Sequence, residues 1–221
     1  MTWLRSLSPV LLMVFAILLS PGARAEASPG DLEQARAFIV DLSERAVAIL
    51  KDPAIDAAQR QQQVSDLIRE GMWMKYVSRF VLGRFWRTAT KPQRREFAAV
   101  FEQFILSELS KRLVGYTDQH IEVGKATAAG KRDILVDAAV VGDDGQPIAL
   151  QWRVRLVKGH YKVIDLAVEN ISMAIEKRAE FSALADKSGV DGLIETLKTK
   201  VAQNNAQSGV PTPPPANPET I

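Results

Sequence analysis

The sequence has 221 residues, with 28 Lys and Arg residues against 26 Asp and Glu residues, two His residues and no Cys. A chain without cysteine forms no disulfides, thiolate nucleophiles, zinc–thiolate sites or iron–sulfur clusters, so burial must supply its stability. The balanced charge disfavours a general polyanion binder, because such proteins carry clustered excess charge, and we expect no nucleic-acid partner. No metal-ligand spacing such as HExxH occurs, so we expect no metal site.

Residues 1–25 have the form of a secretory signal peptide. Arg5 precedes an apolar run over residues 10–19, and the segment ends in the small-x-small sequence Ala23-Arg24-Ala25. The apolar run is too short to span a bilayer comfortably. We therefore expect cleavage after Ala25 and a periplasmic mature protein. Cleavage removes two basic residues and no acidic one, which leaves a formal charge of zero.

Two helices are predicted at the start of the mature chain. Ser28 is placed to cap the first, which buries one face and ends at Pro53. Asp56, with Gln59 three residues later, has the pattern of a capping box and begins the second.

An unusually apolar segment follows over residues 72–82, with Gly83 as the expected C-cap. Neither face of a lone helix here would be polar, which fits a central buried helix or the wall of an internal cavity. Periodicity does not choose between the two. Thr90 and Gln93 then predict the start of a long helix that buries one stripe of aromatic and aliphatic residues.

The hydrophobic period changes to that of strands after this helix. Four segments have strand character, and turn signals at 142–145 and 158–159 separate the last three, which predicts an antiparallel meander. The strands are expected over 121–126, 133–141, 148–156 and 161–168.

The strand over 148–156 alternates between apolar and polar residues. Trp152 and Val154 are assigned to an inner face, while Arg153 and Arg155 are expected on a wet outer face.

The last part of the chain is predicted to be helical and then unstructured. Ser172 caps a helix to Lys187, Gly189 interrupts it, and a final helix ends at about Gln203. The segment 204–221 is rich in proline and is expected to be disordered. Helices, then an antiparallel sheet, then helices indicate one α+β domain over residues 26–203.

Two stretches together resemble the MlaC family of periplasmic lipid-binding proteins, also called toluene-tolerance auxiliary proteins of an ABC transport system. The first is the segment Phe80–Thr90 (FVLGRFWRTAT) with Gln93, and the second runs from Tyr161 to Leu193. Asn170 stands where the family commonly has glycine. The resemblance covers roughly residues 32–200 and does not include the proline-rich tail.

The resemblance implies an NTF2-like or cystatin-like fold in which helices pack on a curved four-stranded antiparallel sheet and enclose an apolar cavity. It also implies a periplasmic carrier of phospholipid. Its partners would be an outer-membrane lipoprotein complex and an inner-membrane ABC transporter with an MCE-type subunit. We expect a monomer, and no enzyme, since the sequence has no nucleophile elbow and no glycine-rich phosphate loop. Trp86 resembles a branch associated with hopanoid-producing bacteria, so a hopanoid or related polycyclic lipid is the alternative cargo. No cofactor is expected apart from the bound lipid.

Large apolar side chains from both parts of the chain are predicted to line the cavity, and cationic ones to lie near its mouth. The predicted lining is Tyr76, Phe80, Val81, Phe101, Phe104, Ile105, Trp152, Val154, Ile164, Leu166, Met173 and Phe181. Arg84 and Arg87 are the candidates for contact with a headgroup or a docking partner.

Two other functions remain open at this stage. A pocket enzyme would need His120 or His160 beside an acid such as Asp118 or Asp165, pointing into the cavity. A non-lipid adaptor or chaperone would instead use the apolar segment as an exposed protein interface.

Overall fold

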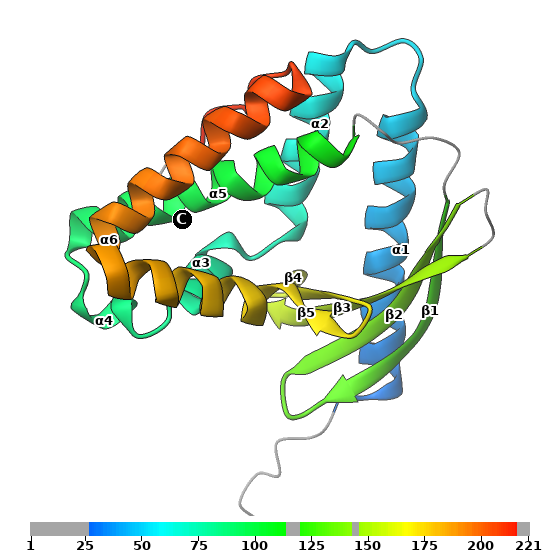
Figure 1. Ribbon diagram of the computed structural model, residues 1–221. Helices are drawn as coiled ribbons and strands as arrows, with labels where there is room; N and C mark the ends of the chain where they lie inside the picture. Colours follow the sequence, from blue (N-terminus) through cyan, green and yellow to red (C-terminus); the bar gives the residue numbers. More distant parts are fainter. Residues whose placement is uncertain (1–26, 114–119, 143–145, 216–221) are drawn as a thin grey trace, which may run out of the picture.

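The computed structural model describes residues 27–113, 120–142 and 146–215, with the side chains of 110–113 excepted. The predicted signal peptide and its cleavage site, Asp118, the centre of the turn at 142–145 and the end of the tail lie outside the described residues. The described part is an α+β fold of helices on an antiparallel sheet, which confirms the predicted class (Figure 1).

The N-terminal helices begin where the sequence predicts. Helix α1 (Pro29–Lys51) follows Ser28, whose hydroxyl accepts a hydrogen bond from the Asp31 backbone N–H at 3.2 Å. Helix α2 (Ala57–Gly71) has the predicted capping box, because the Asp56 carboxylate accepts from the Gln59 N–H and the Gln59 side chain accepts from the Asp56 N–H. Both caps satisfy backbone N–H groups that have no partner within the first helical turn.

The central segment contains three helices. Helix α3 (Met74–Leu82) ends at Gly83, whose φ of 60° is a left-handed conformation that favours glycine. A short helix α4 (Phe85–Thr88), which was not predicted, leads into α5 (Lys91–Leu113). Thr90 and Gln93 hydrogen-bond reciprocally at the start of α5, as expected.

The sheet is a meander with the order β1-β2-β3-β4-β5, and every neighbouring pair is antiparallel. It contains the four expected strands and a fifth of two residues at the edge beside β4. The strands are β1 (His120–Ala129), β2 (Asp133–Val141), β3 (Pro147–Val157), β4 (His160–Val168) and β5 (Ile171–Ser172). The segment before α3 also joins this edge, since the Trp73 N–H donates to the Val163 carbonyl at 2.9 Å.

Helix α6 (Met173–Ser208) changes direction at Gly189, where φ is 71°, so the predicted interruption is present as a kink. The predicted end of this helix is wrong. Asn204, expected to begin the tail, is buried and donates to Ser107 Oγ at 3.1 Å and to Glu108 Oε1 at 2.6 Å. These bonds to α5 satisfy a buried amide and extend the helix to Ser208.

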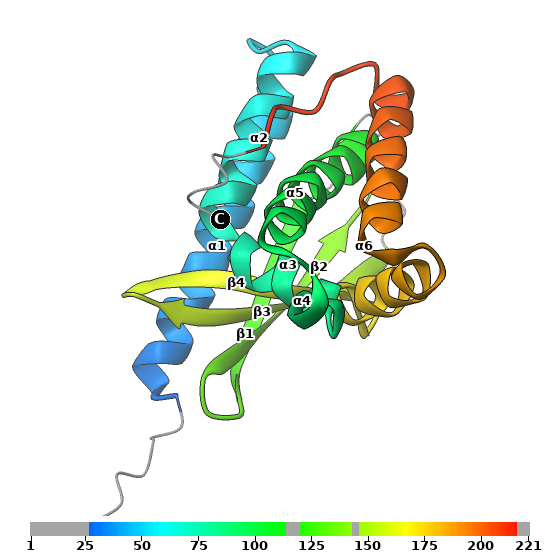
Figure 2. The ribbon, with the colours of Figure 1, turned by 90° about the vertical axis from the view of Figure 1, so that its left-hand side faces the viewer.

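Residues 209–215 turn back from the end of α6 and cross towards α2 (Figure 2). Arg69 of α2 donates to the Pro214 carbonyl at 2.6 Å, and Pro213 is buried. This part of the predicted tail is therefore placed against the domain instead of being disordered.

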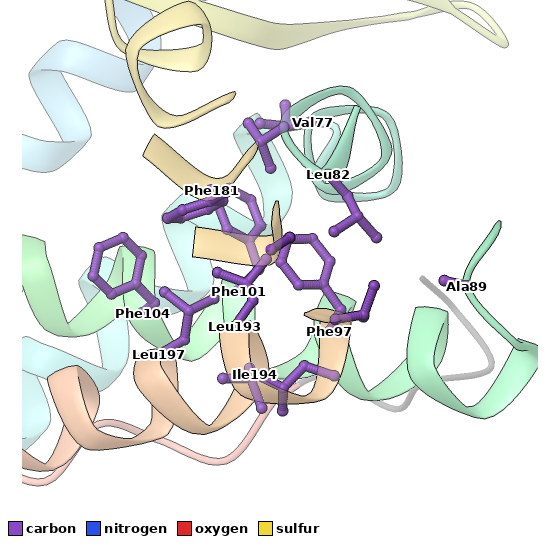
Figure 3. Close-up of a cluster of buried hydrophobic side chains, with 14 of the residues drawn as sticks. Val77, Leu82, Ala89, Phe97, Phe101, Phe104, Phe181, Leu193, Ile194 and Leu197 are labelled. Atoms are coloured by element: carbon purple, nitrogen blue, oxygen red, sulfur yellow. The ribbon is translucent and has the colours of Figure 1, made fainter. Parts of the chain in front are cut away.

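Two separate apolar clusters stabilise the domain. The first, which we call the helical core, contains α3, α5 and α6, with the rings of Phe97, Phe101 and Phe104 each about 6 Å from that of Phe181 (Figure 3). The second, which we call the sheet core, joins α1 to one face of the sheet. Only the half-buried Met72 packs against both among the described residues.

Candidate functional site

The two cores leave a boundary on the face of the sheet opposite α1. Ile134 of β2 packs in the sheet core, whereas its neighbour Asp133 points to the other face because strand side chains alternate. Helix α3 and the start of α6 lie over that other face. We call this boundary the seam. It holds a pocket of about 50 Å³, lined by Tyr76, Phe80, Asp133, Arg153, Ile164, Asp165, Ala174 and Ile175.

Charged groups form the sheet side of the seam. The Asp133 carboxylate lies 2.6 Å from Arg155 Nε and 3.1 Å from Arg153 Nε, and the Arg155 guanidinium lies 4.8 Å from the centre of the Tyr76 ring. The hydrogen bond to Asp133 raises the pKa of Arg155 above its ordinary value. The expectation that both arginines lie on a wet outer face is wrong for Arg155, whose side chain is only 14% exposed.

Asp165, at the end of the seam, has a structural role. Asp165 accepts hydrogen bonds from the Leu166 N–H at 2.9 Å, the Ala174 N–H at 3.0 Å and the Ser172 hydroxyl at 2.5 Å. Ser172 in turn accepts from the Ile175 N–H, as its predicted capping role requires. Asp165 thus fixes the start of α6 against β4, with Ala174 and Ile175 facing the pocket.

An apolar edge borders the seam. Ile175 lines the pocket and is 61% exposed, and Ile171 in the neighbouring strand β5 is 57% exposed. Covering such exposed apolar side chains with a membrane or an apolar ligand is favourable, because it removes apolar surface from water. The seam therefore combines an apolar border, an aromatic wall and a charged floor.

The structure divides the twelve predicted cavity residues into four groups. Tyr76, Phe80 and Ile164 line the pocket at the seam. Leu166 and Met173 are half-buried. The residues that belong to the helical core are Val81, Phe101, Phe104, Ile105 and Phe181.

Trp152 and Val154 belong to the sheet core and pack towards α1. Phe101 and Phe104 belong to the separate helical core, so in this conformation the two pairs of predicted lining residues lie in different clusters. At the seam, the described residues enclose about 50 Å³, and ligand pockets commonly measure about 300–1,000 Å³. The expected lipid-sized cavity is not present there in this conformation.

The predicted headgroup residues lie on α4 and just before it. Arg84 forms an ion pair with Asp186 of α6 and is exposed, as is Arg87. Neither residue lines the pocket at the seam. Their assignment to a cavity mouth is not supported by this arrangement.

The residues of the enzyme hypothesis do not come together at the seam. His120 lies in a groove of about 500 Å³ between α1 and β1, with its ring nitrogen 3.2 Å from Glu122 Oε1. His160 is exposed at the start of β4. The described residues contain no cluster of three or more side chains suited to holding a metal ion.

Sequence reasoning missed the charged floor of the seam. The signal was available, because hairpin register places Asp133 directly opposite Arg155 and an opposite-charge pair at such a position is stabilising. The contribution of Ala174 and Ile175 depends on the angle at which α6 leaves β5, which no sequence pattern specified.

Among the residues described, no helix combines the length and apolar character needed to cross a bilayer.

Comparison with known proteins gives consistent matches. The family model described as MlaC protein matches residues 40–199, which include every residue that lines the pocket at the seam. The intermembrane phospholipid transport system binding protein MlaC of Haemophilus influenzae is 24% identical over 198 residues, 85% of this chain and 89% of that protein. The toluene tolerance protein ttg2D of Pseudomonas putida is 25% identical over 130 residues, 56% of this chain and 60% of that protein.

A solved structure shares the fold. The phospholipid-binding protein from Ralstonia solanacearum, in complex with a phospholipid, superimposes with a TM-score of 0.69 at 24% identity, covering 77% of this chain and 98% of that one. The resemblance seen in the two sequence motifs is thereby confirmed by an independent family match over most of the chain. This protein belongs to the MlaC family.

Proposed function

We propose that this protein is a periplasmic phospholipid carrier that takes up acyl chains at the seam between its helical core and its sheet. The family match over residues 40–199 carries this proposal, and the apolar border and aromatic wall of the seam support it. No chemical step is part of this activity. The protein receives a lipid from one membrane system, shields it from water, and releases it to another.

The physical need for such a carrier follows from the cost of exposing hydrocarbon to water. Exposing the roughly 30 methylenes of a phospholipid to water costs about 0.8 kcal/mol of free energy for each, or more than ~20 kcal/mol in total. A bilayer and an apolar site both keep the chains out of water, so exchange between them has a small net free energy. A soluble carrier thus moves lipid across an aqueous space without a source of energy of its own.

Uptake requires the seam to widen, because the pocket of about 50 Å³ is too small for an acyl chain. The two cores make this the easiest plane of opening. The two cores are separate clusters, so each keeps its own packing if α3 and α6 move away from the sheet. The contacts that separate are those around the small pocket, among them the Arg155–Tyr76 contact and the hydrogen bond from the Ala174 N–H to Asp165. Parting this small set of contacts exposes less apolar surface than opening either buried core.

The proposed partners are those that the family resemblance implies: an inner-membrane ABC transporter with an MCE-type subunit and an outer-membrane lipoprotein complex. The name of the Haemophilus relative, an intermembrane phospholipid transport system binding protein, supports a transport system of this kind.

The identity of the cargo is tested on protein purified from its native host. We expect mass spectrometry of an organic extract to find close to one phospholipid per protein. Recovery of a hopanoid instead would replace phospholipid as the cargo and keep the carrier function. Absence of any lipid, even after incubation with host membranes, would contradict the proposal.

The location of the entry site is tested with two matched isoleucines. Ile175 lines the seam and is 61% exposed, whereas Ile148 is 49% exposed at the start of β3, outside the pocket. Both side chains are on the surface, so replacement of either by Asp should leave the protein folded. We expect Ile175→Asp to slow uptake of a fluorescent phospholipid from vesicles at least several-fold and Ile148→Asp to have little effect. Equal rates in both variants would place the entry elsewhere.

A further inference from the structure

A second pocket, of about 390 Å³, lies beside the seam at the end of the β1–β2 hairpin. It is lined by Ala129, Lys131, Arg132, Asp133 and Arg155. Three of these five residues are cationic and one is anionic, so the pocket has excess positive charge. We call it the basic pocket.

The cations of the basic pocket are available to a ligand. Asp133, the one carboxylate, is already engaged by Arg153 and Arg155. Within the described parts of the chain, Lys131 and Arg132 form no ion pair or hydrogen bond through their side chains. An anion that enters this pocket therefore meets two cationic side chains, Lys131 and Arg132, that pair with no carboxylate of the described residues.

Arg155 is also held in place before any ligand arrives. Its Nε donates to Asp133, its guanidinium carbon lies 4.8 Å from the centre of the Tyr76 ring, and the same side chain lines the basic pocket. A guanidinium fixed in this way binds a phosphate or carboxylate through paired, charge-assisted hydrogen bonds at little entropic cost. The pocket is a preorganised site for an anion.

The basic pocket and the seam are adjacent. Asp133 lines both, and Tyr76, which lines the seam, stacks on Arg155, which lines the basic pocket. A ligand with an anionic group next to an apolar chain spans the two without burying a charge in either core. We propose that the basic pocket binds the phosphate of a phospholipid headgroup while the acyl chains enter the seam. This inference rests on the proposed function and moves the headgroup from Arg84 and Arg87 to the β1–β2 hairpin.

The test measures how strongly the protein prefers a phosphate-bearing lipid. The full mature chain is incubated with vesicles of phosphatidylglycerol that contain diacylglycerol with the same acyl chains, and native mass spectrometry gives the ratio of the two bound lipids. We expect the double variant Lys131→Ala/Arg132→Ala to lower the phosphatidylglycerol-to-diacylglycerol ratio by about tenfold, since two charge-assisted contacts are lost. Total acyl-chain loading should persist, because the seam is intact.

The matched control removes two exposed lysines outside both pockets, Lys125→Ala/Lys187→Ala, and so loses the same charge. A ratio that falls only in the Lys131/Arg132 variant supports the proposal. An unchanged ratio in both variants overturns it and leaves the lipid held by its chains alone. Equal falls in both variants also overturn it, because net charge would then explain the preference.

A second measurement separates this proposal from the proposed function. Inorganic phosphate is titrated into lipid-free protein while NMR follows the Nε–Hε resonance of Arg155. If neither the unmodified protein nor the variants bind lipid, the proposed carrier function is wrong, and this titration alone tests whether the basic pocket binds phosphate. A saturable shift that the Lys131/Arg132 variant lacks supports a phosphate site that serves free phosphate, and no saturable shift overturns it.

Discussion

The replacement Phe181→Ala distinguishes a solid helical core from a lipid cavity. Phe181 is fully buried and packs edge-on against Phe97 and Phe101 at 6.1 Å between ring centres, and against Phe104 at 6.0 Å. Truncation removes these contacts and leaves a void in a close-packed interior. The expected loss in the free energy of unfolding is about 3–5 kcal/mol.

That loss is large for a domain whose total stability is about 5–15 kcal/mol. For a domain of this size it corresponds to a fall in Tm of roughly 6–20 °C. Urea and thermal unfolding of lipid-free protein measure it, with Ile175→Ala as the control. Ile175 is 61% exposed, so its truncation should change stability by less than about 0.5 kcal/mol.

The outcome also bears on where the lipid lies. If Phe181 lined a cavity that already exists, truncation would enlarge that cavity at small cost and would alter lipid uptake. A loss below about 1 kcal/mol, together with changed lipid loading, would therefore refute the solid-core interpretation and restore the cavity predicted from sequence.

Three further changes test the framework around the seam. Asp165→Ala removes the cap of α6 and should lower the free energy of urea unfolding by about 1–2 kcal/mol, with faster amide exchange in the first turn of the helix. Burial raises the pKa of Glu180, but hydrogen bonds from Lys177 and Lys200 outweigh burial and hold the pKa below its ordinary value. The unfolded chain therefore binds the proton of Glu180 more tightly than the folded protein does. The free energy of unfolding that this difference contributes is lost as pH falls below about 4.5. Glu180→Gln should therefore reduce the fall in the free energy of unfolding measured between about pH 5 and 3. Deletion of 209–221 should cost about 1–2 kcal/mol in unfolding experiments but leave lipid loading unchanged, because its described part, residues 209–215, contacts α2 through the Arg69–Pro214 hydrogen bond.

Local sequence chemistry predicted the boundaries of most elements. The members of the pairs Asp56–Gln59 and Thr90–Gln93 are only three residues apart, and each pair satisfies backbone groups within one helical turn. The same holds for Gly83 and Gly189, whose positive φ values end or bend a helix. These features depend on neighbours a few residues apart, so they are visible without knowledge of the fold.

The contents of the site were harder to predict. Alternation along β3 separates Trp152 and Val154 from Arg153 and Arg155, but it does not say which set faces which helix. The usual assumption that charged residues face water failed for Arg155, because Asp133 and Tyr76 compensate its burial. That compensation comes from segments separated by many residues.

By itself, the sequence determined the α+β class, the caps, the meander and the family, because each of these depends on periodicity or on a motif read along the chain. Only the tertiary structure decided that the buried apolar residues gather in two separate cores, and that Lys131, Arg132 and Arg155 meet beside the seam. The reason is physical. Periodicity fixes which side chains share a face, whereas the partner of that face depends on how whole elements pack, and packing is set by contacts between residues far apart in the chain.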